Sequence, residues 1–141
     1  MYTGSCLCQA VTFEIHSELD PIQICHCSQC RKAQGSAFVT NIPVSKKDFS
    51  LLSGEAALSF YESSPGKHRV FCKHCGSPVY SETKALPGVV RIRAGSLNGK
   101  LHTQPGFHIY YESKANWFDI NDNLPKFSNL PEKPKLETEI E

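Results

Sequence analysis

The sequence lacks an excess of charge of either sign. Its 141 residues include 15 Lys and Arg and 14 Asp and Glu, which gives a formal net charge of +1 with neutral histidines. Domains that bind the phosphate backbone of nucleic acids usually carry a marked basic surplus. The charge balance therefore argues against a nucleic acid partner and gives no indication of an anionic membrane surface.

Long hydrophobic runs are also missing. No stretch approaches the roughly 20 apolar residues that cross a bilayer as a helix. The first twenty residues contain no basic start followed by an apolar run, because Glu14, His16, Glu18 and Asp20 interrupt it. We therefore expect a cytoplasmic protein with no membrane association.

No long amphipathic helix and no internal repeat can be recognised. Short segments of strand-forming residues instead alternate with turn signals such as Ser64-Pro65-Gly66, and one short helix is expected over 28–34, ended by Gly35. This pattern predicts a mainly β fold, in a single domain long enough to bury its own core. The expected strands cover residues 10–15, 36–42 (closed by Pro43), 49–52, 57–61, 68–71, 78–81, 89–94 and 107–111.

The composition changes near the C-terminus. From Pro125 onward Pro, Lys and Glu dominate, and few large apolar residues are left. Such a segment buries too little apolar surface to fold by itself. We expect a zinc-binding domain over residues 1–124 and a tail over 125–141 that lies along the surface or is disordered.

Cysteine, in contrast, is abundant: there are seven. Three lie within six residues in Cys25-His26-Cys27-Ser28-Gln29-Cys30, and Cys72-Lys73-His74-Cys75-Gly76 has the form of a zinc knuckle. Cys6 and Cys8 have the spacing that places two side chains on one face of a strand. Because cytosolic thiols are kept reduced, an odd number of closely spaced cysteines favours metal ligation over disulfides.

Seven ligands divide naturally into four and three, and the sequence allows two divisions. In the first, Cys27 and Cys30 join the knuckle pair Cys72 and Cys75 in a zinc ribbon. In the second, the knuckle pair joins Cys6 and Cys8 in a closed site of four thiolates. Local geometry favours the second division, because three neighbouring thiols can form a site without long-range assembly. The remaining trio is then Cys25, Cys27 and Cys30.

A zinc ion with three protein ligands keeps one coordination position open, which is typical of catalytic sites. Three thiolates leave the ion with a net charge of −1, so a bound water is acidified only weakly and hydrolysis is not the natural use. A thiol is more acidic than water, and zinc coordination deprotonates it. Attack of such a thiolate on an aldehyde carbonyl would form an S-hydroxymethyl-type adduct, and the reverse would cleave a carbon–sulfur bond.

Several motifs together resemble the glutathione-dependent formaldehyde-activating enzyme family, whose domain also occurs in centromere protein V. The resemblance implies a zinc-ribbon-like β-tent fold with two zinc ions, and glutathione binding near the second. It also implies that Cys6, Cys8, Cys72 and Cys75 hold a structural zinc, and Cys25, Cys27 and Cys30 the second zinc. The motifs are Gly4-Ser5-Cys6-Leu7-Cys8-Gln9-Ala10-Val11, Cys25-His26-Cys27-Ser28-Gln29-Cys30-Arg31-Lys32, Phe71-Cys72-Lys73-His74-Cys75-Gly76, Arg93-Ala94-Gly95-Ser96-Leu97 and the stretch His108 to Trp117.

The sequence thus predicts a zinc-dependent carbon–sulfur lyase that forms or cleaves an adduct of a small thiol, such as glutathione, with formaldehyde or a related aldehyde. The alternative is a non-catalytic, zinc-stapled module that binds a protein or nucleic acid. Arg31, Lys32, Arg91 and Arg93 are candidate contacts for glutathione carboxylates.

The histidines and the single tryptophan carry weaker signals. His26 should point away from the metal if its segment is extended, and His74 should face solvent. We expect His108 and Trp117 to be buried in the core. The sequence gives no indication of the oligomeric state.

Overall fold

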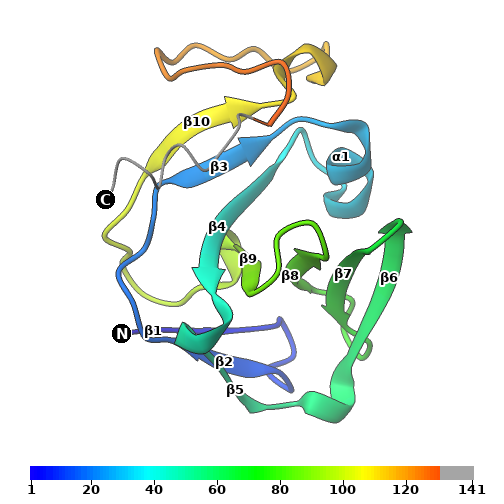
Figure 1. Cartoon of the computed structure of the whole chain (residues 1–141), viewed down its shortest axis with the longest axis vertical. Helices are drawn as coiled ribbons and strands as arrows, with labels where there is room; N and C mark the ends of the chain where they lie inside the picture. Colours follow the sequence, from blue (N-terminus) through cyan, green and yellow to red (C-terminus); the bar gives the residue numbers. More distant parts are fainter. Residues whose placement is uncertain (131–141) are drawn as a thin grey trace.

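Two β-sheets and one short α-helix make up residues 1–130, the part of the chain described by the computed structural model (Figure 1). The smaller sheet has three antiparallel strands in the order β1-β2-β5. These strands are β1 (Tyr2–Ser5), β2 (Thr12–Ile15) and β5 (Phe49–Ser53).

The larger sheet has seven strands in the order β10-β3-β4-β9-β8-β7-β6, all antiparallel except for the β10–β3 pair. Neither strand order closes on itself, so both sheets are open. The prediction of a mainly β fold is confirmed, while its assignment as a β-tent stays a prediction. The strands are β3 (Ile22–Cys25), β4 (Val39–Ser45), β6 (Leu58–Ser64), β7 (Lys67–Cys72), β8 (Pro78–Thr83), β9 (Val89–Arg93) and β10 (Pro105–Ile109).

The main core includes side chains from both sheets. Phe13 and Ile15 of β2 pack in one buried cluster with residues of β4 and β9, among them Ile42 and Ile92. Alternation along a strand places such residues on one face, and burial of each side chain stabilises the fold by about 1.5–3 kcal/mol. One face of the larger sheet therefore packs into the apolar core.

The register places polar and cationic residues together on the larger sheet. Arg69 of β7 lies opposite Ser81 of β8, which lies opposite Arg91 of β9, and Arg93 lies opposite Asn41 of β4. Strand periodicity adds Lys67, two residues before Arg69, to the same side. We call Asn41, Lys67, Arg69, Ser81, Arg91 and Arg93 the cationic face.

The helix α1 (Ser28–Gln34) lies against the cationic face. It begins after Cys27, whose sulfur accepts a hydrogen bond from the Cys30 amide at 3.3 Å, and ends at Gly35 with φ 65°, a left-handed conformation that suits glycine. The helix predicted over 28–34 is confirmed. Four 3₁₀ turns complete the described elements: Lys46–Asp48, Glu55–Ala57, Ala94–Ser96 and Tyr111–Ser113.

Three local expectations were wrong. Pro43 does not end its strand but lies within β4, at a point beyond Asn41 where β3 no longer pairs with it, so proline removes no bond on that side. Cys6 and Cys8 lie in the turn between β1 and β2 rather than in a strand. Trp117 is 65% exposed and not part of the core.

The segment after β10 folds back beside it (Figure 1). The His108 amide donates to the Pro125 carbonyl at 2.9 Å, and the Phe127 amide donates to the His108 carbonyl at 2.9 Å. The predicted boundary between residues 124 and 125 stays a prediction, and residues 131–141 of the predicted tail lie outside the described range. Within residues 1–130, no helix combines the length and apolar character needed to span a bilayer.

Candidate metal centres

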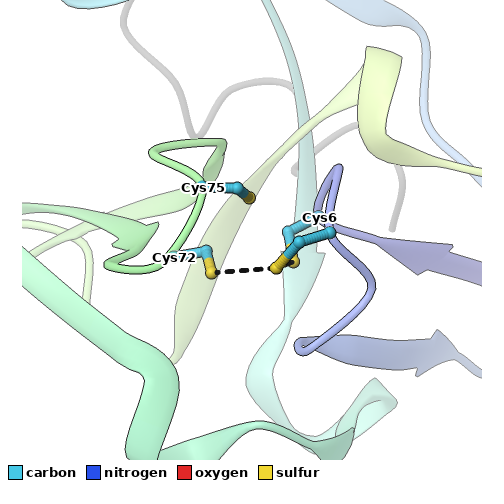
Figure 2. A group of neighbouring side chains, drawn as sticks. Cys6, Cys72 and Cys75 are labelled. Atoms are coloured by element: carbon cyan, nitrogen blue, oxygen red, sulfur yellow. Dashed lines mark hydrogen bonds between the residues drawn. The ribbon is translucent and has the colours of Figure 1, made fainter.

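Four cysteine sulfurs, from the turn between β1 and β2 and from the end of β7 with the turn after it, converge at one end of the core. Figure 2 shows Cys72, at the end of β7, and Cys75, on the turn that follows, facing the turn that carries Cys6. The Cys6 and Cys8 sulfurs are 3.7 Å apart, and the Cys8 and Cys72 sulfurs are 3.8 Å apart. All four sulfurs lie within 4.8 Å of one another, and we call this set the four-cysteine cluster.

Local hydrogen bonds hold the knuckle in shape. The Gly76 amide donates to the Cys72 carbonyl at 2.7 Å, and Gly76 leaves the turn with φ 79°. Hydrogen bonds from the Ser77 hydroxyl and amide lower the pKa of the Cys75 thiol to about 5. The Val11 amide donates to the Cys6 sulfur at 3.3 Å. Such donors stabilise sulfur in its thiolate form, the form that ligates metals.

The remaining three sulfurs form a second group, the trio, also within 4.8 Å. Cys25 ends β3, Cys27 precedes α1, and Cys30 lies in its first turn. Cys25 and Cys30 are buried, and Cys27 is half-buried. Within residues 1–130, no histidine, carboxylate or fourth cysteine joins the trio. All seven cysteines are free thiols, grouped as in the second of the two divisions considered above.

The sulfur spacing in the four-cysteine cluster fits a tetrahedral zinc ion, and the trio sulfurs, within 4.8 Å of one another, are close enough to share one ion. Zinc–sulfur bonds of about 2.3 Å at tetrahedral angles place the sulfurs about 3.8 Å apart. The 3.7 and 3.8 Å separations in the four-cysteine cluster agree with this spacing. The donor set of four thiols suits a closed site, and that of three thiols leaves room for one further ligand.

Cys30 is the sulfur of the trio that lies beside a cation. Hydrogen bonds from Cys25 and Cys27, together with the charge of Arg69, lower the pKa of the Cys30 thiol. Hydrogen bonds with Cys27 and Cys30, together with burial, raise the pKa of the Cys25 thiol. The Arg69 Nη2 and Nη1 atoms lie 3.7 and 3.9 Å from the Cys30 sulfur. Negative charge on the Cys30 sulfur is therefore stabilised by a cation that the protein itself supplies.

Arg69 and Arg93 are both buried, and both form several hydrogen bonds within the protein. Arg69 donates to the Ser63 hydroxyl at 2.9 Å and to the Gln29 side chain at 3.5 Å. Arg93 donates through Nη1 to the Asn41 side chain and to the Ser81 hydroxyl, and through Nε to the Gln34 side chain at 3.3 Å. Burial lowers the pKa of Arg93 to about 10. Arg93 thus braces α1 against the sheet.

Lys67 and Arg91 are the less engaged members of the cationic face. Both are half-buried, and within residues 1–130 neither side chain has a hydrogen bond or an ion pair. Burial lowers the pKa of each, while negative charge on trio sulfurs, including Cys30, opposes this effect. Two cations thus face the trio without a carboxylate partner in this part of the chain.

The other two predicted substrate contacts, Arg31 and Lys32, lie on α1 and not on the cationic face. Arg31 donates through Nε to the His26 carbonyl at 3.4 Å, and Lys32 is exposed. His74 is exposed, as expected. The ring of His26 is directed to His108, with Nε2 of His26 2.8 Å from Nδ1 of His108, and does not belong to the trio. The prediction that His26 points away from the sulfurs is confirmed.

Sequence reasoning missed Arg69 and Lys67 as parts of this site. The signal was present, because Lys67 and Arg69 have the same two-residue spacing as Arg91 and Arg93. What the sequence did not reveal was the register that sets β7 beside β8 and β9. Gln23, two residues before Cys25, was also missed, and its buried Oε1 has no hydrogen-bond partner within residues 1–130.

Fold and site together define a class of protein: a mainly β, thiol-rich domain with one group of four cysteines and one of three, each compact enough to hold a metal ion. Residues 1–113 match the family model described as glutathione-dependent formaldehyde-activating enzyme. The chain belongs to this family.

Two known proteins are similar to the chain. A Schizosaccharomyces pombe protein, named as an uncharacterized lyase, is 33% identical over 79 residues, which are 56% of this chain. The match spans 56% of that relative's length. A Rhodobacter sphaeroides protein of known crystal structure superposes with a TM-score of 0.61 at 21% identity, covering 72% of this chain and 97% of that one. This second likeness concerns the fold alone.

Proposed function

We propose that the protein is a zinc-dependent carbon–sulfur lyase that forms or cleaves an adduct between glutathione, or a related acidic thiol, and formaldehyde or a related aldehyde. The observation that carries the proposal is the trio, three sulfurs within 4.8 Å that no fourth side-chain ligand completes within residues 1–130. Membership of a family described as glutathione-dependent and formaldehyde-activating supports the choice of substrates. The lyase name of the S. pombe relative agrees with it.

In this proposal the chain binds two zinc ions. Cys6, Cys8, Cys72 and Cys75 hold a structural ion, and Cys25, Cys27 and Cys30 hold the second. When bound at the trio, zinc supplies the positive charge that keeps thiols deprotonated near neutral pH. Arg69 contributes from the protein side, because its guanidinium stabilises negative charge on the Cys30 sulfur.

The cationic face explains why the thiol substrate should carry carboxylate groups. Three thiolates with one Zn²⁺ carry a charge of −1, whereas Lys67, Arg69, Arg91 and Arg93 carry +4 when protonated. Half-buried cations without partners are costly, so a ligand that brings carboxylates is stabilised there. Glutathione has two carboxylates and one thiol.

Arg91 and Lys67 are the first proposed carboxylate contacts, since neither is engaged within residues 1–130. Arg93, whose hydrogen bonds are to other residues of the protein, helps to hold the site together and is a less available carboxylate contact. Arg31 and Lys32 remain proposed contacts for a second carboxylate that extends along α1.

The reaction itself is an addition without net oxidation or reduction. The thiol sulfur forms a bond with the carbonyl carbon, the carbonyl π electrons move to oxygen, and the proton lost by the thiol is replaced by one on that oxygen. The reverse breaks the carbon–sulfur bond and returns the aldehyde and the thiol. The chain contributes orientation of the thiol by cations and exclusion of water by the buried sulfurs.

The proposed partners are therefore small molecules, and the proposed location is the cytoplasm. A nucleic-acid-binding module is a weaker candidate, because the cations that cluster here face the trio and not an open surface. The proposed domain covers residues 1–124.

Calorimetry tests the proposed thiol site directly. Glutathione titrated into the zinc-loaded protein in two buffers of different ionisation enthalpy should show proton release, because the thiol binds as a thiolate. S-methylglutathione should bind far more weakly, and Cys30→Ser should abolish the difference. Equal affinity for the two ligands, unchanged by Cys30→Ser, would sink the proposal.

Two further arms test the carboxylates and the reaction. Glutathione diethyl ester should bind at least tenfold more weakly than glutathione, and Arg91→Met should remove most of that discrimination, whereas Lys100→Met, at an exposed site, should keep it. Exchange of ¹³C-formaldehyde with its glutathione adduct, followed by NMR, should be faster with the zinc-loaded protein than without protein. An exchange rate equal to the uncatalysed rate would favour a binding module over an enzyme.

A further inference from the structure

A chain of hydrogen bonds, buried at its two histidines, links the trio segment to the C-terminal part of the domain. Nε2 of His26 lies 2.8 Å from Nδ1 of His108, and Nε2 of His108 lies 2.9 Å from Oδ2 of Asp122. Both imidazoles are 1% exposed. Three residues separated by up to 96 positions thus form one continuous network, and its first member stands between Cys25 and Cys27.

Asp122 is itself fixed in place. Its Oδ1 accepts hydrogen bonds from the Leu124 amide at 3.0 Å and from the Lys126 ammonium at 3.1 Å. The backbone of the same segment bonds to β10 on both sides of His108. Asp122 lies beyond residue 113, where the family match ends. The contact therefore comes from a part of the chain that the family motifs do not include.

The network has a defined direction. An ionised carboxylate only accepts hydrogen bonds, and the bond from His108 lowers the pKa of Asp122 to about 2. Nε2 of His108 must therefore donate to Asp122. In a neutral imidazole the other nitrogen, Nδ1, then accepts, so Nε2 of His26 donates to it. Asp122 thereby selects one tautomer for both rings.

The remaining contacts fix the ring and the backbone of His26. Tyr111 and Phe38 each place a ring edge against the imidazole, with centroids 5.6 Å away. The His26 amide donates to the Ile109 carbonyl at 3.1 Å, and its carbonyl accepts from Arg31. Because peptide planes on both sides of His26 are held, the directions of the Cys25 and Cys27 side chains are held with them.

We propose that Asp122 and His108 are positioning residues for the metal at the trio, acting through the ring of His26. They touch neither the sulfurs nor a substrate. Their contribution is comparable to that of carboxylates that orient ligands from outside the coordination sphere, whose removal typically weakens metal binding 10–100-fold, but here it reaches Cys25 and Cys27 through the backbone of His26. The inference rests on the proposed zinc at the trio but not on the identity of the thiol or the aldehyde.

The test measures how quickly each zinc ion leaves the full-length, zinc-loaded protein in the presence of a chromophoric chelator. Comparison with Cys30→Ser assigns the phase that belongs to the trio. Asp122→Ala should accelerate this phase roughly tenfold and leave the four-cysteine phase unchanged. In cobalt-substituted protein, the same change should shift the trio's sulfur-to-cobalt absorption bands and leave those of the four-cysteine cluster unaltered.

Matched variants separate positioning from general stability. Asp119→Ala, an exposed carboxylate in the same segment with no bonded partner within residues 1–130, should match the wild type. His108→Leu should behave like Asp122→Ala, while His108→Asn, whose amide oxygen can stand in for Nδ1 as the acceptor, should recover most of the slow release. If His108→Leu does not fold, Asp122→Ala still decides, since its side chain is 40% exposed and removable without a cavity.

Several outcomes would overturn the inference. One is trio release in Asp122→Ala at the wild-type rate, and another is equal acceleration at both zinc sites, which would indicate loss of general stability. Wild-type protein with zinc only at the four-cysteine cluster would overturn it together with the proposed function. If Asp122→Ala accelerates zinc release from the trio as expected but glutathione does not bind, only the proposed function would be overturned.

Discussion

The guanidinium of Arg69 lies 3.7 Å from the sulfur of Cys30, although 39 positions separate the two residues. Arg69 comes from β7 and Cys30 from α1, so the contact ties the helix to the cationic face of the larger sheet. The same guanidinium is held by Ser63 and Gln29. An arginine fixed in this way stabilises a thiolate without needing to move.

Replacing Arg69 should therefore weaken the trio selectively. Arg69→Met keeps the apolar stem but removes the charge beside Cys30, so zinc affinity at the trio should fall roughly tenfold. Chelator competition on the zinc-loaded protein measures this affinity. Arg91→Met, a neighbouring arginine with no bonded contact to a cysteine, serves as the matched control and should change zinc affinity less. Equal effects of the two substitutions would show that the total charge matters and the Arg69 contact does not.

The metal content gives a second prediction. Gently purified protein should contain close to two zinc ions per chain, because the sulfur spacing fits one site of four thiols and one of three. Stepwise addition of a chelator should remove the trio zinc first, since three ligands hold it and four hold the other. Elemental analysis that finds no zinc, together with disulfides in freshly reduced lysate, would contradict the scheme.

The two clusters should also fail differently when a ligand is lost. Cys72→Ser breaks a link between turns that are 64 positions apart, so it should reduce soluble yield and lower the melting temperature by several degrees or more. Cys30→Ser removes one ligand from a local segment and should give folded protein that holds one zinc. Differential scanning calorimetry with a zinc count compares the two variants. Equal losses in both would argue against a structural role for one site alone.

Much of this architecture could be predicted from local patterns. Alternation of Val11, Phe13 and Ile15 indicated a strand that enters the core, and the helix over 28–34 followed from the turn signal at Gly35. The knuckle at Cys72 and Cys75 was recognisable from spacing, because two thiols and a following glycine act over five residues. Features set by short-range geometry were therefore accessible from the sequence.

What the sequence did not reveal depends on strand register and long-range packing. Arg69 and Arg91 lie on either side of Ser81 only because β7, β8 and β9 pair in one register, and the sequence does not determine that register. The partnership of His108 with Asp122 requires the chain to turn back beside β10. Trp117 was expected in the core by its residue type, yet it is 65% exposed.

The pH dependence of the Asp122 contact yields the last prediction. The hydrogen bond from His108 lowers the pKa of Asp122 to about 2, below the ordinary 3.8, so the folded state binds this proton less readily than the unfolded state. The contribution of Asp122 to stability is then fully present above about pH 4 and is lost as the pH falls from about 4 to 2. Asp122→Asn should melt a few degrees below the wild type at neutral pH. This difference should be the same at pH 7 and pH 5 and should shrink at pH 3, while Asp119→Asn should show no difference at any of the three values. A difference between Asp122→Asn and the wild type that has already disappeared at pH 5 would show that the Asp122 carboxylate is not stabilised by His108.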